Sequence, residues 1–156
     1  MPIKPVVIEK KDHIATLVLN RPEVMNAMSK EMILELHAAV KKIAADDDVH
    51  VVILKGAGDN FSSGADISLF SESIAPHDWL VAMKGVGRIV RTLREMPQPV
   101  VTQLKGVAVG GGANLALAGD FVIAADNARF CEIFVNIGLI MDYGGTYLLP
   151  RLVGLT

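Results

Sequence analysis

The chain has 156 residues, of which 51% are apolar and 21% charged, and its formal net charge is −2. This length suits one domain with a core of its own, and the charge gives no reason to expect nucleic acid or an anionic membrane as a partner. The sequence has no apolar stretch near the roughly 18 residues of a membrane span and no signal-peptide core at its start. With a single cysteine, it is expected to be cytoplasmic and to act on a small molecule.

In the first half of the chain, predicted strands alternate with predicted helices. Residues 13–20, "HIATLVLN", have the alternation and β-branched residues of a strand. Ser29 can cap a helix whose apolar residues recur at three- and four-residue spacing to about Ala45. Residues 49–58 form a continuous apolar run that is typical of a buried parallel strand. A second helix is expected from about His77 to the prolines of "MPQP", with an apolar stripe of Trp79, Leu80, Met83, Val86, Val90 and Leu93.

The second half continues the same alternation. Residues 100–109, "VVTQLKGVAV", predict one buried strand, and a short helix opened by glycine is expected from Gly112 to about Ala118. Residues 120–126 predict another strand, and a last short helix is bracketed by glycines and Pro150. This order predicts an α/β fold with a parallel sheet and crossover connections.

Two glycine-containing junctions between a strand and a helix are candidates for a ligand site. They are "FSSGADI" (61–67) and "VGGGANL" (109–115). Glycine lets the backbone approach a ligand, and the first N–H groups of a helix have no partner inside it. If one N–H group from each junction met at a single carbonyl oxygen, the two would form an oxyanion hole. The spacing is equally compatible with glycines that only permit tight packing.

Several other functional motifs are missing from the sequence. The glycine stretches lack the last glycine of G-x-G-x-x-G and the lysine of a P-loop. There is no G-x-S-x-G nucleophile motif, and the four histidines lack ligand spacing, so no metal site is expected.

Four blocks of sequence, in this order, resemble the enoyl-CoA hydratase/isomerase family, the crotonase superfamily. They are "NRPEVMNAMS", "FSSGADI", "QPVVTQLKGVAVGGGANLALAGD" and "IGLIMDYGGTYLLPRLVG". The resemblance implies a crotonase-like spiral of ββα units that binds an acyl-CoA thioester, with coenzyme A as part of the substrate and no separate cofactor. Residues 1–156 would be the core domain without the usual C-terminal helical trimerisation region, and the full-length protein would be a homotrimer or hexamer.

The same resemblance implies roles for individual residues. The backbone N–H groups of Ala65 and Gly111 would form the oxyanion hole. The CoA adenine would lie near Ser63, Ala65, Asp66 and Ile67, with Met25 and Arg21 near the pantetheine or phosphates. Arg21 is equally well explained as a surface charge.

The sequence departs from the hydratase pattern at both catalytic acids, where it has Asn114 and Phe134 in place of glutamate. Glu132 is two residues from the second position, but its spacing to "NIGL" argues against a shifted alignment. Asp142, between an apolar run and two glycines, is the remaining candidate, and desolvation should raise its pKa. Isomerases of the family resembling the ring-opening enoyl-CoA isomerase of the phenylacetate pathway have aspartate at this place. Asp142 would then be the base of a double-bond isomerisation, unless it serves only a turn or a helix N-cap.

Three other functions are open on the sequence alone. The first is hydration of a 2-enoyl-CoA despite the missing glutamates. The second uses Asp142 as a nucleophile, as aroyl-CoA dehalogenases of the superfamily do with a tryptophan where this chain has Phe134. The third is a non-catalytic acyl-CoA-binding subunit.

Overall fold

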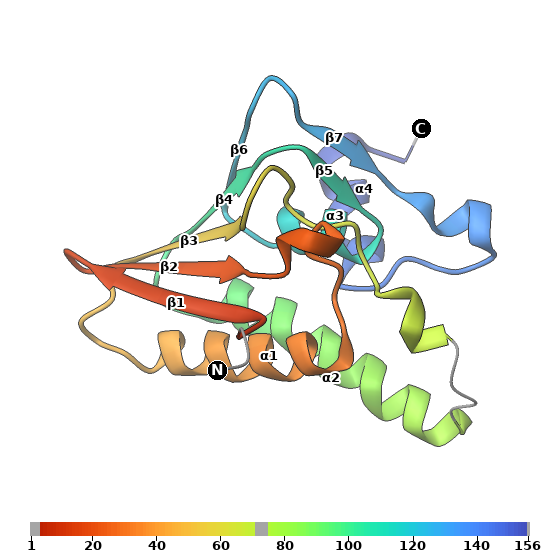
Figure 1. Cartoon of the computed structure of the whole chain (residues 1–156), viewed down its shortest axis with the longest axis horizontal. Helices are drawn as coiled ribbons and strands as arrows, with labels where there is room; N and C mark the ends of the chain where they lie inside the picture. The colour runs from red at the N-terminus through yellow and green to blue at the C-terminus, as the bar shows by residue number, and fades with distance from the viewer. Residues whose placement is uncertain (1–3, 71–74, 156) are drawn as a thin grey trace.

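The computed structural model describes residues 4–70 and 75–155. Its main sheet has five strands in the order β1-β2-β3-β4-β6, and a short sheet pairs β5 with β7 (Figure 1). The strands are β1 Val6–Lys11, β2 Ile14–Leu19, β3 Val51–Gly56, β4 Val100–Leu104, β5 Val107–Val109, β6 Phe121–Ala124 and β7 Arg129–Cys131. The helices are α1 Lys30–Ala44, α2 Pro76–Glu95, α3 Gly111–Leu117 and α4 Gly145–Val153, with 3-10 turns η1 Pro22–Val24, η2 Ile67–Phe70 and η3 Ile133–Ile137.

The chain repeats one unit: a strand of the main sheet, a short extended segment, and a helix. In two units the extended segment is a strand, so that β4, β5 and α3 follow one another, as do β6, β7 and α4. In the first two units it is only an isolated bridge, at Met28↔Ala65 and Ser62↔Ala108. The mixed α/β chain is therefore a spiral of ββα units, as the sequence blocks imply.

The main sheet is parallel from β2 to β6, as the alternation of elements predicts, but it begins with an antiparallel hairpin. Asp12 and His13 form the turn of this hairpin, with φ of 49° and 63°. Two consecutive residues of positive φ are the mark of a tight hairpin turn that matches the twist of the strands. The predicted strand therefore starts at Ile14 rather than His13, and β1 is an element that the sequence patterns did not predict.

The single strand predicted over residues 100–109 is wrong, because the structure divides it between two sheets. β4 pairs with β3 and β6 in the main sheet, whereas β5 pairs with β7. Gly106, with φ of 60°, makes the bend between them. A side chain there would collide with the backbone oxygen of Asp59, so glycine is required by both conformation and space.

The two long helices cover one face of the main sheet (Figure 1). Ser29 is the N-cap of α1, and its side chain accepts a hydrogen bond from the N–H of Met32, as predicted. The predicted apolar stripe of α1 faces the core. In α2 only the second half packs into the core, through Val86, Ile89, Val90 and Leu93. Leu80 and Met83 of the predicted stripe are exposed, because the first half of α2 extends beyond the sheet. Within residues 4–70 and 75–155, no helix combines the length and apolar character needed to cross a membrane.

Candidate active site

An open pocket of about 450 Å³ lies where the two glycine junctions meet. Its walls are mostly apolar, and the one acidic side chain among its described lining residues is Asp142. The lining residues are Ser63, Gly64, Ala65, Ile67, Phe70, Val109, Gly110, Gly111, Ile133, Phe134, Ile137, Leu139 and Asp142. A mostly apolar cavity with a few converging polar groups is the usual form of a small-molecule site.

The backbone N–H of Ala65 faces away from its neighbouring segment. In the parallel bridge with Met28, the N–H of Met28 donates to the oxygen of Gly64, and the N–H of Asp66 donates to the oxygen of Met28. Because backbone groups alternate in direction along an extended segment, the N–H of Ala65 points to the opposite side. Within the described part of the chain it donates no hydrogen bond, so it is available to a ligand.

The N–H of Gly111, the first residue of α3, likewise donates no hydrogen bond to the residues that the structure describes. The preceding residue, Gly110, donates instead to the oxygen of Cys131 at 2.9 Å, which ties α3 to the end of β7. A Cβ atom on Gly64 would lie 2.6 Å from the oxygen of Val109 and 3.7 Å from the nitrogen of Gly111. Gly64 thus brings the two junctions together, and Ala65 and Gly111 both line one pocket.

Asp142 is half-buried beside this pair of donors. A Cβ atom on Gly111 would lie 3.2 Å from its Oδ1 atom, which places the carboxyl next to the start of α3. Burial raises the pKa of Asp142 to about 6 and outweighs the opposing effect of the Asn114 amide. Among the described residues, no N–H at the start of α4 donates to the side chain of Asp142; its backbone oxygen instead accepts a hydrogen bond from the N–H of Gly145 at 2.8 Å.

Three more polar side chains lie close to the Asp142 carboxyl: Asn114, Glu132 and Tyr143. Spacing along the sequence argues against Glu132 as a site residue, yet the structure brings it here. Asn114 is fully buried, and a Cβ atom on Gly145 would collide with its amide. Burial, then the nearby charge of Asp142, raises the pKa of both Glu132 and Tyr143. The hydrogen bond from Gly110 to Cys131 is what brings Glu132 here, a tertiary contact that spacing along the sequence does not reveal.

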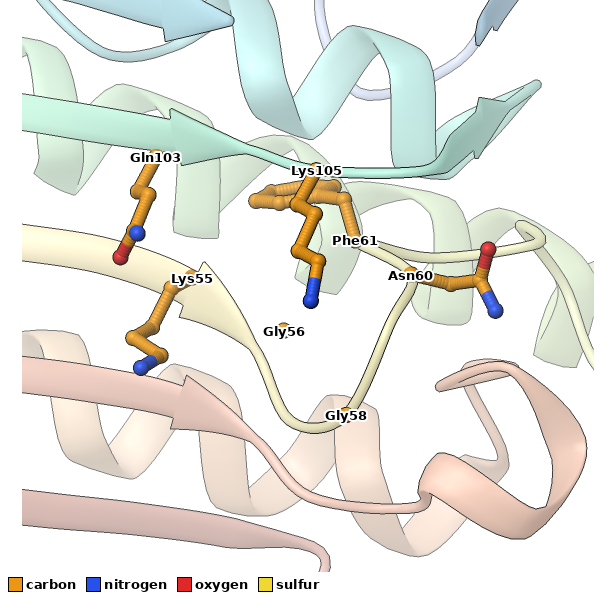
Figure 2. Close-up of a pocket in the computed structure, with 7 residues that line it drawn as sticks. All are labelled: Lys55, Gly56, Gly58, Asn60, Phe61, Gln103 and Lys105. Carbon is orange, nitrogen blue, oxygen red and sulfur yellow. The ribbon is translucent and has the colours of Figure 1, made fainter. Parts of the chain in front are cut away.

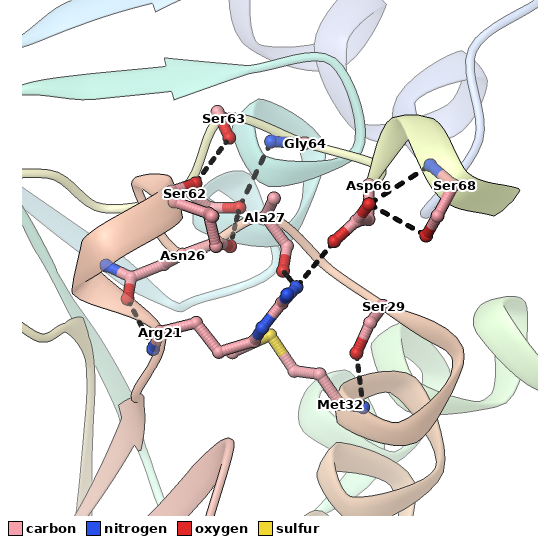
Figure 3. A network of polar contacts seen from close by, with 11 residues as sticks. Arg21, Asn26, Ala27, Ser29, Met32, Ser62, Ser63, Gly64, Asp66 and Ser68 are labelled. Atoms are coloured by element: carbon pink, nitrogen blue, oxygen red, sulfur yellow. Dashed lines mark hydrogen bonds and ion pairs between the residues drawn. The ribbon is translucent and has the colours of Figure 1, made fainter. Parts of the chain in front are cut away.

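Arg21 and Asp66 form an ion pair of 2.7 Å behind the segment that carries Ala65 (Figure 3). Nη1 of Arg21 also donates to the oxygen of Ala27 at 2.7 Å, and the guanidinium holds the pKa of Asp66 below its usual range. The hydroxyl of Ser62 donates to the oxygen of Asn26 and accepts from the N–H of Gly64. This network joins the loop after β2 to the Ala65 segment. Arg21 is therefore a paired charge that connects the two segments.

The remaining residues expected at the CoA site divide into two groups. Ser63 and Ile67 line the pocket, with Phe70 beside them. Phe70 in turn stacks on Trp79 at 6.1 Å between ring centroids. Met25 is 48% exposed and lies outside the described pocket lining. The structure thus brings Asp142, Ala65, Gly111, Ser63 and Ile67 to one pocket, while Asp66 and Arg21 pair with each other.

A second, smaller cavity of about 160 Å³ lies at the carboxyl ends of β3 and β4 (Figure 2). Lys55 and Gln103 lie side by side at its edge, and Lys105 binds Asp59 at 2.7 Å. Its described lining shares no residue with the larger pocket and contains no acidic side chain. The described lining of this cavity therefore offers neither a carboxylate nor the Ala65 and Gly111 N–H groups.

The fold and the pocket define a class: α/β proteins of spiral ββα units with paired backbone donors beside one carboxyl group. The sequence matches the enoyl-CoA hydratase/isomerase family over residues 9–156. It is 41% identical over 144 residues to the 1,2-epoxyphenylacetyl-CoA isomerase of Escherichia coli K12, covering 90% of this chain and 55% of that protein. It is 38% identical over 155 residues to the crotonyl-CoA hydratase of Syntrophomonas wolfei, covering 99% of this chain and 59% of that protein.

A crystal structure of enoyl-CoA hydratase from Thermoplasma volcanium GSS1 superposes with a TM-score of 0.90 at 34% identity, over 97% of this chain and 60% of that one. The protein belongs to the enoyl-CoA hydratase/isomerase family. The chain spans between half and two thirds of the length of these relatives.

Proposed function

We propose that this protein isomerises the double bond of an enoyl-CoA thioester, with Asp142 as the base and the N–H groups of Ala65 and Gly111 as the oxyanion hole. The observation that carries the proposal is the position of Asp142, the one described acid in a pocket that also holds two free backbone donors. With a pKa of about 6, most Asp142 side chains are deprotonated near neutral pH, and the carboxylate is a stronger base than an ordinary aspartate.

The geometry supports a reaction in two proton transfers. The thioester oxygen accepts hydrogen bonds from both N–H groups, which makes the C2 proton acidic. The Asp142 carboxylate takes that proton, and the electron pair of the broken C–H bond moves into a dienolate whose negative charge rests on the thioester oxygen. Asp142 then returns the proton to C4, and the electrons settle as the double bond between C2 and C3. One carboxyl group is sufficient if it reaches both carbon atoms.

The apolar walls suit the rest of this substrate. Ile133, Phe134 and Leu139 line the pocket together with Asp142 and can cover an acyl group. Ser63 and Ile67 lie beside Ala65, where the thioester end must bind if the oxyanion hole is used. We propose that the CoA moiety leaves the pocket along this side, toward exposed Met25. Arg21 is paired with Asp66, so it would hold the loop after β2 in place and need not bind phosphate.

The direct test is the conversion of a 3-enoyl-CoA to its conjugated isomer, followed by the rise in thioester absorbance. Asp142→Asn should lower kcat by about 10² to 10⁴-fold, the range lost with a general base. The matched control is Asp47→Asn, at an exposed position in the turn after α1, which should retain the wild-type rate. Full turnover by Asp142→Asn would contradict the assigned role.

Hydration of a 2-enoyl-CoA is the second candidate, because Glu132 gives the site a further carboxyl close to Asp142. A hydratase must hold water and also supply a proton, which two carboxyls can do. Loss of conjugated thioester absorbance with crotonyl-CoA measures this reaction. A hydration rate above the isomerisation rate would favour it. Binding of CoA thioesters without exchange of the C2 proton in deuterated water would instead identify a non-catalytic binding protein.

A further inference from the structure

Glu132 is a buried carboxyl group that the proposed mechanism does not use. It follows β7, and the hydrogen bond from Gly110 to the oxygen of Cys131 holds that end of the strand against the start of α3. Glu132 is not among the residues that line the pocket, yet both of its carboxyl oxygens are inaccessible to solvent. Its carboxyl group is close enough to Asp142 for the Asp142 charge to raise the pKa of Glu132.

The unsatisfied polar atoms of the protein gather at this place. Seven buried side-chain nitrogen or oxygen atoms of the described residues have no aligned hydrogen-bond partner, and six of them belong to Asn114, Glu132, Asp142 and Tyr143. Buried polar groups are almost always paired in folded proteins, because an unpaired one costs about 1 to 3 kcal/mol. A cluster of such groups beside a pocket marks a place where function, rather than stability, determines the side chains.

The charges in the cluster have one sign. Burial raises the pKa of both Asp142 and Glu132, and the Asn114 amide opposes the rise at both. The backbone N–H of Asp142 also lowers the pKa of Asp142, and the Asp142 carboxylate raises that of Glu132. Tyr143 adds a hydroxyl group that burial keeps neutral. No lysine, arginine or histidine in the described part of the chain contributes to either carboxyl. Two carboxylates so placed, with no cation, repel each other and disfavour the doubly charged state.

Asn114 lies between the two acids. Its amide is near enough to both carboxyl groups to favour their charged forms, although neither contact is aligned as a hydrogen bond. An amide offers two N–H donors and one oxygen acceptor, so it can serve a charged carboxylate on one side and a protonated carboxyl on the other. The tight contact of Asn114 with Gly145 fixes the amide in this position.

We propose that Glu132 and Asp142 form a carboxyl pair across Asn114 that shares one proton, with Glu132 as a positioning residue for Asp142. In the state in which the shared proton is on Glu132, Asp142 is charged and can act as a base. When Asp142 accepts a proton from substrate, both carboxyls are neutral, so the buried site never has to hold two adjacent charges. The pairing itself does not depend on the reaction, whereas its use in catalysis rests on the proposed function.

The test is an NMR titration of the substrate-free protein with carbon-13 in the aspartate carboxyl groups. In the wild type, the Asp142 signal should titrate in two steps, because each carboxyl senses the other. Glu132→Gln keeps the shape of the side chain and should reduce the curve to one step, while Glu132→Asp should keep two. Glu9→Gln, at an exposed position on β1, is the matched control and should leave the wild-type curve unchanged. An Asp142 curve that is identical in wild type and Glu132→Gln would overturn the pair.

The reciprocal measurement guards against a folding defect. With carbon-13 in the glutamate carboxyl groups, Asp142→Asn should lower the midpoint of the Glu132 titration, because the coupling acts equally in both directions. A kinetic measurement then separates the two proposals. If isomerase activity is absent but the coupled titration is present, the proposed function fails and the pair stands. If Glu132→Gln keeps the wild-type kcat and pH profile while activity is present, the positioning role is wrong.

Discussion

Gly64 is in direct contact with the strand end that leads to Gly111. Its φ is 91°, and a Cβ atom on it would lie 2.6 Å from the oxygen of Val109, just before the N-cap of α3. This approach places Ala65 and Gly111 at one pocket, so the proposed oxyanion hole depends on the absence of a side chain at position 64.

Gly64→Ala should therefore separate the two donors. We expect a loss of about 10²-fold in kcat, as for removal of one oxyanion-hole donor, and a loss of about 1 to 3 kcal/mol in the free energy of unfolding. Initial rates and urea unfolding measure both. Gly154→Ala is the control, because Gly154 has a similar φ of 86° and open space around it. Equal kinetic losses in both variants would mean that backbone strain, not donor geometry, is responsible.

Asp142→Asn should stabilise the protein at neutral and higher pH. The folded pKa of about 6 is above the ordinary value of 3.8, so the folded state binds more protons between these values and the free energy of unfolding falls as pH rises through this range. Removing the charge should recover on the order of 2 kcal/mol at pH 8 and less than about 1 kcal/mol near pH 4. Urea unfolding at both pH values tests this. A variant less stable than wild type at pH 8 would contradict it.

The rate of the proposed isomerisation should depend on pH through the same carboxyl group. Since a base must be deprotonated, kcat/KM should rise about tenfold per pH unit below pH 6 and level off above it. Rates measured from pH 4.5 to pH 8 with a 3-enoyl-CoA give the profile. A profile that is flat across this range would separate the measured activity from the titration of Asp142.

The ion pair between Arg21 and Asp66, the residue after Ala65, should hold the Ala65 segment of the proposed oxyanion hole in place. Asp66→Asn removes the charge of a largely buried partner, and we expect a loss of about 1 to 2 kcal/mol in stability and a several-fold lower kcat with little change in KM. Circular dichroism melting and steady-state rates check both effects.

The control for this prediction is Glu95→Gln, which breaks the exposed pair with Arg91 in α2. Exposed pairs contribute at most about 1 kcal/mol, so this variant should behave like the wild type. If Asp66→Asn changes KM and leaves kcat intact, Asp66 contacts the substrate instead of holding Ala65.

Much of the fold could be predicted from local patterns. The apolar stripe of α1 and the apolar runs of β3 and β4 predict which of their residues are buried. The patterns failed where neighbours decide the structure. Residues 100–109 form one apolar run, yet Gly106 divides it because each part pairs with a different partner strand. The exposed first half of α2 has the same cause, since a periodic stripe does not show how far the sheet beneath it extends.

The sequence by itself determined the candidate groups for chemistry: glycines at two junctions, and Asp142 in a chain that has Asn114 and Phe134 in place of the hydratase acids. Only the tertiary structure decided which of these groups meet. It joined Ala65 to Gly111 through Gly64, paired Arg21 with Asp66, and brought Glu132 beside Asp142 through a hydrogen bond between Gly110 and Cys131. Such contacts link segments far apart in the chain, and local spacing determines the conformation of a segment but not its neighbours.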